Sequence, residues 1–352
     1  MFVIGLGTAT PPNRYSQTDC WNAFRAADQF SSLTPRAREI LETVLTGKNG
    51  ISTRFLALKS LEEAFELTPD VLHGRFREYA PLLASQAAER ALRKAGCRPQ
   101  DMDAVIISTC TGYLCPGLTS YVAERLGLRS DVLALDLVGQ GCGAALPNLR
   151  TAEALLAAGR SRRVLSICVE ICSAAFYLDN NAGVLISACL FGDGAGAAVL
   201  SGTPPSHGRR VDWMATGSSI DPADRNALCF EQREGMLRNV LSRQVPSLAA
   251  RHADRVLQHV LAKAGLTPAD ISTWIWHAGG RNVLTALQQK LGLTAGDIRW
   301  SSAVLNDFGN LSSAFVYFVL QQALEENAPG GWWWMSSFGA GFSCHGALLK
   351  VS

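Results

Sequence analysis

The 352-residue sequence has no excess of charge of either sign. Lys and Arg number 32 against 30 Asp and Glu, the net charge is +2, and 18% of the residues are charged while 48% are apolar. This balance argues against a nucleic-acid-binding polycation and against a disordered chain. What is left is a globular protein long enough to bury a sizeable core, in one large domain or two.

No apolar run reaches the length of a membrane span, so no membrane-crossing segment is expected. The N-terminus, MFVIGLGTATPPNRY, lacks the basic start and the cleavage pattern of a secretion leader. The ten cysteines include no CxxC pair and have no His partners at metal spacing, and GDGAG does not form the dinucleotide motif GxGxxG. We therefore expect a cytoplasmic protein with mostly buried thiols and neither a metal nor a redox cofactor.

The chain contains an internal repeat. Residues 91–110, ALRKAGCRPQDMDAVIISTC, align without gaps on residues 260–279, VLAKAGLTPADISTWIWHAG, with seven identities in twenty positions. Each copy runs from an amphipathic helix through a Pro-x-Asp turn into a short apolar strand. The sequence therefore predicts a duplicated α/β fold, with halves 1–205 and 206–352 joined near the linker SGTPPSHGRR.

The correspondence continues through the rest of each half. A second strand, at 133–139 or 299–305, precedes a helix that begins near Cys142 or near Asn310. An apolar strand and a glycine-punctuated strand then close each half. We therefore expect the same βαβαβαββ pattern twice.

A single cysteine, Cys142, lies between two glycines in DLVGQGCGAALPNLR, where an apolar strand gives way to a helix. In a pseudo-twofold body, equivalent helix starts meet near the axis, so Cys142 and Asn310 should approach each other. His277, at the tip of the repeated strand, can join them. Free N–H groups at a helix start and a nearby imidazole lower a thiol pKa to about 3.5–7.5. The three residues therefore predict a nucleophilic thiolate assisted by an imidazole and an amide.

Each of these residues also has a plainer interpretation. A buried Cys is often a small core residue, a lone His a structural one, and an Asn a helix cap. The order Cys, His, Asn also occurs in papain-like cysteine hydrolases, but their local signature C-G-[SA]-C-[WY] is absent. Because the three residues occupy equivalent or adjacent elements of a duplicated fold, we favour a catalytic set, and we rank a papain-like hydrolase below another class of thiol enzyme.

Longer segments resemble a known family. GQGCGAALPNLRTAEALL, LFGDGAGAAVL, WHAGGRNVL, NDFGNLSSAFVYFVL and the closing SFGAGF are similar to the type III polyketide synthases, the chalcone-synthase-like branch of the thiolase fold. The resemblance covers essentially the whole chain, and the spacing between motifs agrees as well. It implies an α/β, thiolase-like, five-layered αβαβα body and a homodimer.

The resemblance also implies an acyltransferase whose substrates are coenzyme A thioesters. Cys142 would take an acyl-CoA starter as a thioester. His277 and Asn310 would bind the thioester carbonyl of malonyl-CoA as it loses CO2, and the enolate would attack the Cys142 thioester. Repetition and cyclisation would give a polyketide. A ketoacyl-ACP synthase III-like enzyme shares the fold and the three residues and is the alternative.

Matched positions supply the expected binding residues. Phe191 matches a gatekeeper phenylalanine between the coenzyme A tunnel and the cavity, and Lys48 lies where the family contacts the nucleotide. The coenzyme A set is completed by Gly279 and Gly280. The implied substrate-binding set is Phe191, Cys110, Cys115, Glu170, Cys172, Ala175, Ser187, Asn239, Ser312, Gly339 and Ala340.

The chain departs from the plant pattern at several of these positions. Ala175 replaces a threonine, Ser187 a glycine and Ala340 a proline, while Asn239 is the nearest match to a second gatekeeper phenylalanine. We therefore expect a longer, more apolar cavity and hypothesise a fatty acyl or other bulky apolar starter, with an alkylresorcinol- or alkylpyrone-like product. Cys115 stands where a longer methionine reaches into the neighbouring subunit's cavity.

Overall fold

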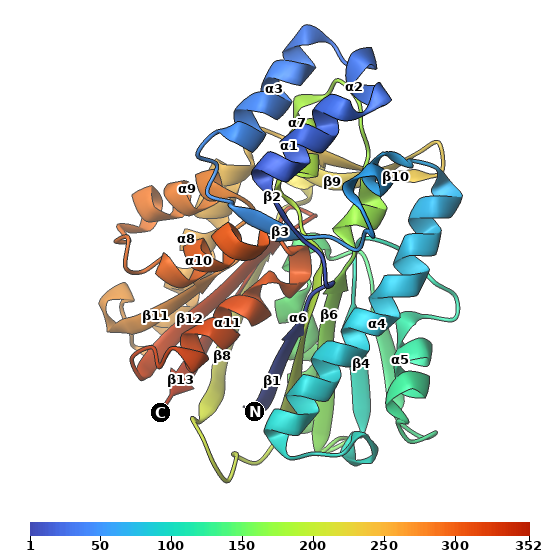
Figure 1. Cartoon of the computed structure of the whole chain (residues 1–352). Helices are drawn as coiled ribbons and strands as arrows, with labels where there is room; N and C mark the ends of the chain where they lie inside the picture. The colour runs from blue at the N-terminus through green and yellow to red at the C-terminus, as the bar shows by residue number, and fades with distance from the viewer.

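The computed structural model describes all 352 residues as a layered α/β body (Figure 1). Nine strands form one large mixed sheet. The first half of the chain supplies β1 (Phe2–Ala9), α4 (Pro69–Ala95), β4 (Ala104–Ser108), α5 (Leu118–Leu126), β5 (Leu133–Leu137), α6 (Ala145–Ala157), β6 (Arg163–Glu170), α7 (Ala182–Leu190) and β7 (Gly194–Ser201).

The second half of the chain supplies β8 (Val211–Ile220), α8 (Val245–Ala264), β11 (Ile271–Trp276), α9 (Arg281–Leu291), α10 (Arg299–Phe308), α11 (Phe315–Glu325), β12 (Gly331–Gly339) and β13 (Ser343–Val351). Smaller elements lie over one end of the sheet. They are β2 (Arg14–Ser16), α1 (Gln17–Ala26), α2 (Asp28–Ser32), α3 (Pro35–Thr46), β3 (Thr53–Phe55), β9 (Leu228–Arg233) and β10 (Met236–Leu241).

The order of strands in the large sheet shows the duplication. Counted outward from the centre, the strands are β1, β7, β6, β4 and β5 in the first half and β8, β13, β12 and β11 in the second. In each half the first strand is central, the last strand is next to it, and the earlier strands follow toward the edge. The halves join where β1 and β8 pair antiparallel, with Val3 opposite Val211. The second half lacks only a counterpart to the edge strand β5.

Helices separate and cover the two halves of the sheet. The helices α6 and α11 both contact strands of either half, so they form a central layer. On the outside, α4 packs on β1, β6 and β7, and α8 packs on β8 and β13. This arrangement confirms the predicted five-layered αβαβα fold. The division of the chain at 205 and 206 stays a prediction.

The strand expected at 299–305 is wrong, because this segment lies within the helix α10. Its buried residues are Trp300, Ser301, Val304 and Leu305, which are spaced to share one helical face rather than alternate. The seven residues 299–305 are too few to separate a helical from an alternating pattern, whereas the ten residues of α10 show the helical spacing. The helix replaces the missing tenth strand.

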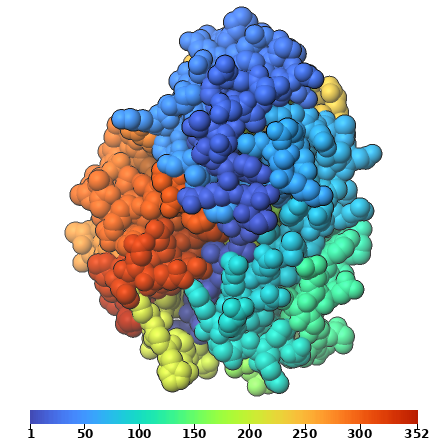
Figure 2. Space-filling model, viewed as in Figure 1, coloured from blue at the N-terminus to red at the C-terminus, as the bar shows by residue number.

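The N-terminal segment covers the end of the sheet where the site lies. The helices α1 and α3 pack on α7 through an apolar cluster that includes Cys20, Leu41 and Leu185. Figure 2 shows this segment, in blue, lying over the seam between the orange C-terminal half and the cyan helices. No helix combines the length and the apolarity that crossing a bilayer requires.

Candidate active site

Cys142 lies in a single 3-10 turn, Gly141–Gly143, that leads into α6. Its side chain is buried, at 8% exposure. Gly141 has a φ of +56°, and a Cβ there would lie 3.0 Å from the backbone N of Ala340. A Cβ on Gly143 would lie 3.1 Å from the backbone N of Gly339. The two glycines therefore let the 339–340 loop pack directly against the cysteine turn.

Hydrogen bonds link Cys142 to Asn310, and link Asn310 to the loop that follows His277. The Ser312 hydroxyl donates to Cys142 Sγ at 3.2 Å, and the Ser312 N–H donates to Asn310 Oδ1 at 2.9 Å. Asn310 Nδ2 donates to the Gly279 carbonyl at 3.2 Å. A Cβ on Gly279 would lie 4.0 Å from His277 Nε2. Cys142 thus comes from the first half of the chain, and its companions come from the second.

The backbone at Asn310 is tied to the segment that carries Phe191. The Asn310 N–H donates to the Leu190 carbonyl at 2.8 Å, and the Gly192 N–H donates to the Asn310 carbonyl at 3.0 Å. These bonds make a parallel bridge between Phe191 and Asn310. The predicted gatekeeper and the predicted amide donor are therefore held by the same pair of backbone contacts.

The site carries no charge partner for its imidazole. His277 is 3% exposed, and its Nδ1 has no hydrogen-bond partner. Burial lowers the pKa of His277 to about 3, so the ring is neutral at pH 7. Burial also raises the pKa of Cys142 to about 12, opposed by the hydrogen bond from Ser312. The lowered thiol pKa expected from the helix start is therefore wrong, because desolvation outweighs the helix-start N–H groups.

A buried carboxylate organises the polar groups behind Cys142. Glu170 is fully buried and accepts hydrogen bonds from Ser313 Oγ, from Thr111 Oγ1 at 2.9 Å and from the Cys110 N–H at 3.0 Å. Ser312 Oγ lies 3.3 Å from the same carboxyl group, so Glu170 and Cys142 Sγ are alternative acceptors for its single proton. Burial raises the pKa of Glu170, while these donors lower it. Glu170 thereby holds together the polar groups that surround the Ser312 hydroxyl.

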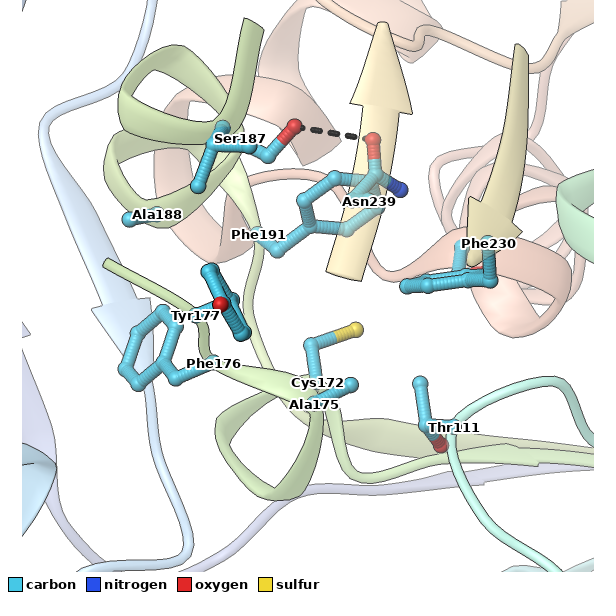
Figure 3. Close-up of a pocket in the computed structure, with 12 residues that line it drawn as sticks. Thr111, Cys172, Ala175, Phe176, Tyr177, Ser187, Ala188, Phe191, Phe230 and Asn239 are labelled. Carbon is cyan, nitrogen blue, oxygen red and sulfur yellow. Dashed lines mark hydrogen bonds between the residues drawn. The ribbon is translucent and has the colours of Figure 1, made fainter. Parts of the chain in front are cut away.

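A pocket beside these groups contains six of the predicted substrate-binding residues (Figure 3). They are Cys172, Ala175, Ser187, Phe191, Asn239 and Ser312. Sequence reasoning missed the other lining residues, which are Thr111, Phe176, Tyr177, Val184, Ala188 and Phe230. Cys110 and Glu170 lie behind Ser312 instead, and Gly339 and Ala340 lie against the cysteine turn.

Phe230 alters the expected effect of Asn239 on the cavity. In the β9–β10 hairpin Asn239 pairs with Phe230, and its Oδ1 accepts a hydrogen bond from Ser187 Oγ at 3.0 Å. The ring that Asn239 lacks is therefore supplied by its neighbour across the hairpin. The signal available in the sequence is the dipeptide Glu234-Gly235, a two-residue turn with positive φ at both residues that sets this register.

The remaining predicted residues lie away from the pocket. Cys115 is exposed, and its peptide bond to Pro116 is cis. Lys48 is exposed, and its carbonyl accepts a hydrogen bond from Arg281 Nη1 at 2.6 Å. Arg281 begins α9 directly after Gly280, so a cation missed by the sequence analysis adjoins the expected coenzyme A set.

Two family models match the chain. One, described as FAE1/type III polyketide synthase-like protein, matches residues 62–251, which is more than half of the chain. The other, for the C-terminal domain of chalcone and stilbene synthases, matches residues 215–351. The two matches together cover residues 62–351.

Individual proteins are similar over nearly the whole chain. A 3,5-dihydroxyphenylacetyl-CoA synthase from Amycolatopsis orientalis is 30% identical over 98% of this chain and 92% of its own. A 1,3,6,8-tetrahydroxynaphthalene synthase from Streptomyces peucetius subsp. caesius is 32% identical over 99% and 92%. The crystal structure of PKS-I from the brown alga Ectocarpus siliculosus matches with a TM-score of 0.90 and 25% identity, over 99% of this chain and 97% of the other.

Proposed function

Since the chain belongs to the type III polyketide synthases, which extend acyl-CoA starters with malonyl-CoA, we propose that Cys142 carries the growing acyl chain and that His277 and Asn310 activate malonyl-CoA. The observation that supports this assignment is the set of hydrogen bonds that links Cys142 through Ser312 to Asn310, and Asn310 to Gly279, two residues after His277. The family membership sets aside the carrier-protein synthase and the cysteine hydrolase.

The neutral state of the site suits the first step. A neutral His277 can take the Cys142 proton as the sulfur attacks the acyl-CoA carbonyl, with release of the coenzyme A thiol. In the second step, Asn310 Nδ2 and an N–H of His277 donate to the thioester oxygen of malonyl-CoA. Loss of CO2 moves negative charge onto that oxygen, and such donors typically lower the barrier by about 3–4 kcal/mol each. The enolate carbon then attacks the Cys142 thioester.

We propose an apolar acyl starter, and a second apolar pocket supports this choice. Twelve of its thirteen lining residues are hydrophobic, and it shares Phe176, Tyr177 and Ala188 with the pocket beside Ser312. Figure 3 shows Phe176 and Tyr177 on the side of that pocket opposite Thr111. The distal carbons of a chain bound to Cys142 would pass these side chains. The cyclised product would then be of the alkylresorcinol or alkylpyrone type.

A hydroxylated aromatic without an alkyl chain is a second candidate product. The relatives at 30% and 32% identity are named for 3,5-dihydroxyphenylacetyl-CoA and 1,3,6,8-tetrahydroxynaphthalene. The Phe230 ring, which narrows the pocket beside Asn239, also favours a compact product.

A starter panel separates the two products. The enzyme is incubated with labelled malonyl-CoA alone and with acetyl-, p-coumaroyl-, octanoyl- or dodecanoyl-CoA, and the products are analysed by mass. We expect the highest kcat/KM with the long apolar chains. Preference for acetyl-CoA, p-coumaroyl-CoA or malonyl-CoA alone would overturn the apolar starter.

Variants of the proposed nucleophile test the site itself. Cys142→Ala should abolish the acyl adduct seen in the intact mass of the protein. Cys142→Gln should still release CO2 from malonyl-CoA without extending a chain, because the proposed oxyanion donors, His277 and Asn310, are unchanged. An acyl adduct on the Ala variant would disprove the assignment of Cys142.

We propose that the enzyme acts as a homodimer, as its family typically does, through the edge strand β5. Its residue Leu133 is 42% exposed, and Val138, directly after the strand, is 55% exposed. Tyr113, in the loop at the same end of the neighbouring strand β4, is 68% exposed. Large apolar side chains at an uncovered sheet edge suit contact with a second copy. Cys115 lies in the same loop as Tyr113.

A further inference from the structure

Arg54 is a buried cation without an acidic partner. It lies on β3, is 1% exposed and takes part in no ion pair. Its Nη1 donates to the carbonyls of Ala188 at 2.8 Å and Phe191 at 2.9 Å, and its Nε donates to Gln17 Oε1 at 3.1 Å. Burying a charge is costly unless its donors are paired. Its contacts with the α7 end are therefore what offsets that cost.

Gln17 extends the same contact. It is 5% exposed, begins α1, and donates through Nε2 to the Cys189 carbonyl at 3.0 Å. Ala188, Cys189 and Phe191 lie at the C-terminal end of α7, where the last helical carbonyls have no partner within the helix. A guanidinium is well suited to this end, because the helix dipole is negative there.

The end of α7 also holds Asn310. The Leu190 carbonyl accepts the Asn310 N–H, and the Asn310 carbonyl accepts the Gly192 N–H. The aliphatic stem of Arg54 supports the other side of this junction, since a Cβ on Gly309 would lie 2.9 Å from Arg54 Cγ. Arg54 therefore touches the backbone on both sides of the bridge between Phe191 and Asn310.

From these contacts we propose that Arg54, assisted by Gln17, is a positioning residue that sets the Asn310 amide and the Phe191 ring for the reaction. This proposal rests on the proposed function of Asn310. Arg54 does not touch the reacting atoms, so it acts on the steps that need Asn310 and Phe191. It should leave the attack of Cys142 on a short starter unchanged, because such a starter does not extend into the second apolar pocket, which Arg54 also lines.

Substitution of Arg54 should slow the release of CO2 from malonyl-CoA and leave the acylation of Cys142 unchanged. In Arg54→Met, we expect kcat for CO2 release from malonyl-CoA to fall about 10- to 100-fold, because small misplacements of a catalytic group have effects of that size. KM for malonyl-CoA should change much less. Acylation of Cys142 by acetyl-CoA, which is too short to extend into the pocket that Arg54 lines, should keep its wild-type rate when followed by intact mass. Arg54→Lys, which keeps the charge, should lie between the two.

Arg75 offers a matched control. It is 7% exposed and donates to the carbonyls of Ser173 at 2.6 Å and Glu63 at 2.8 Å, away from the end of α7. Arg75→Met should lose stability in thermal unfolding without the selective loss of CO2 release. If Arg54→Met does not fold, Gln17→Leu tests the same anchor, with a smaller selective loss expected.

Three results would overturn the positioning role. They are wild-type CO2 release in the Arg54 and Gln17 variants, an equal loss of acylation and CO2 release, or the same selective loss in Arg75→Met. Failure of the proposed function would look different, because the wild-type enzyme itself would then neither acylate Cys142 nor release CO2.

Discussion

The hydroxyl of Ser312 is the single side-chain group that stabilises a Cys142 thiolate. We predict that Ser312→Ala raises the thiol pKa further and slows alkylation of Cys142 by iodoacetamide about tenfold at pH 8, as expected for loss of a hydrogen bond to a charged group. The rate is read from the mass of the Cys142 peptide. Ser313→Ala is the control, because Ser313 bonds Glu170 and not the sulfur. Equal rates in Ser312→Ala and the wild type would contradict the prediction.

Glu170 predicts a pH dependence of stability. Burial raises its pKa in the folded protein above the ordinary 4.5, so the folded state binds its proton more tightly than the unfolded state. Its contribution is therefore complete below pH 4.5 and is lost as the pH rises through the folded-state pKa. Glu170→Gln cannot titrate. Urea unfolding from pH 4 to pH 9 should show the wild type losing stability relative to Glu170→Gln as the pH rises, and a constant difference would refute this.

At the scale of elements, the cysteine turn depends on Gly141. We predict that Gly141→Ala lowers the free energy of unfolding by about 1 kcal/mol or more, because its positive φ disfavours a side chain and the new Cβ meets Ala340. It should also impair acylation of Cys142. Gly159→Ala is a matched control, since Gly159 has a φ of +66° and open space around it. That variant should lose a similar amount of stability from φ alone and acylate normally.

The sequence indicated the elements where its pattern is long or repeated. The duplicated segment correctly located α4, β4, α8 and β11 and therefore the fold class. The helix α10 was missed because its apolar face was judged over seven residues, too few to separate the two periods. A long or repeated pattern therefore identifies an element from sequence, whereas a short apolar segment such as that in α10 needs the structure.

The site was predictable in part for the same reason. The proposed set of Cys142, His277 and Asn310 comes from the places of these residues in the repeat and in the family motifs, and their catalytic roles stay a prediction. Phe230 depends on the register of a hairpin, and Arg281 depends on a contact with a loop more than 200 residues away. The pKa directions also needed the structure, because desolvation is a property of the packed surroundings and not of neighbours in sequence.

At the scale of the whole molecule, assembly should depend on the β5 edge. We predict that Val138→Lys converts a dimer to a monomer, measured by analytical ultracentrifugation, because the ammonium group would have to be desolvated in the contact. Val71→Lys is the control, since Val71 is an exposed apolar residue on α4 away from that edge. A Val138→Lys protein that sediments as a dimer would place the contact elsewhere.

Replacement of the tenth strand by α10 makes the two rims of the sheet unequal. The outer strand β11 is buried at five of its six residues, whereas none of the five residues of β5 is buried. Because α10 packs against β11, the β5 edge is the one left open to a strand from another molecule. Two copies that pair their β5 edges about a twofold axis each use the one open edge that they have. The dimer therefore has no free edge to which a third copy could add, and an open filament cannot form.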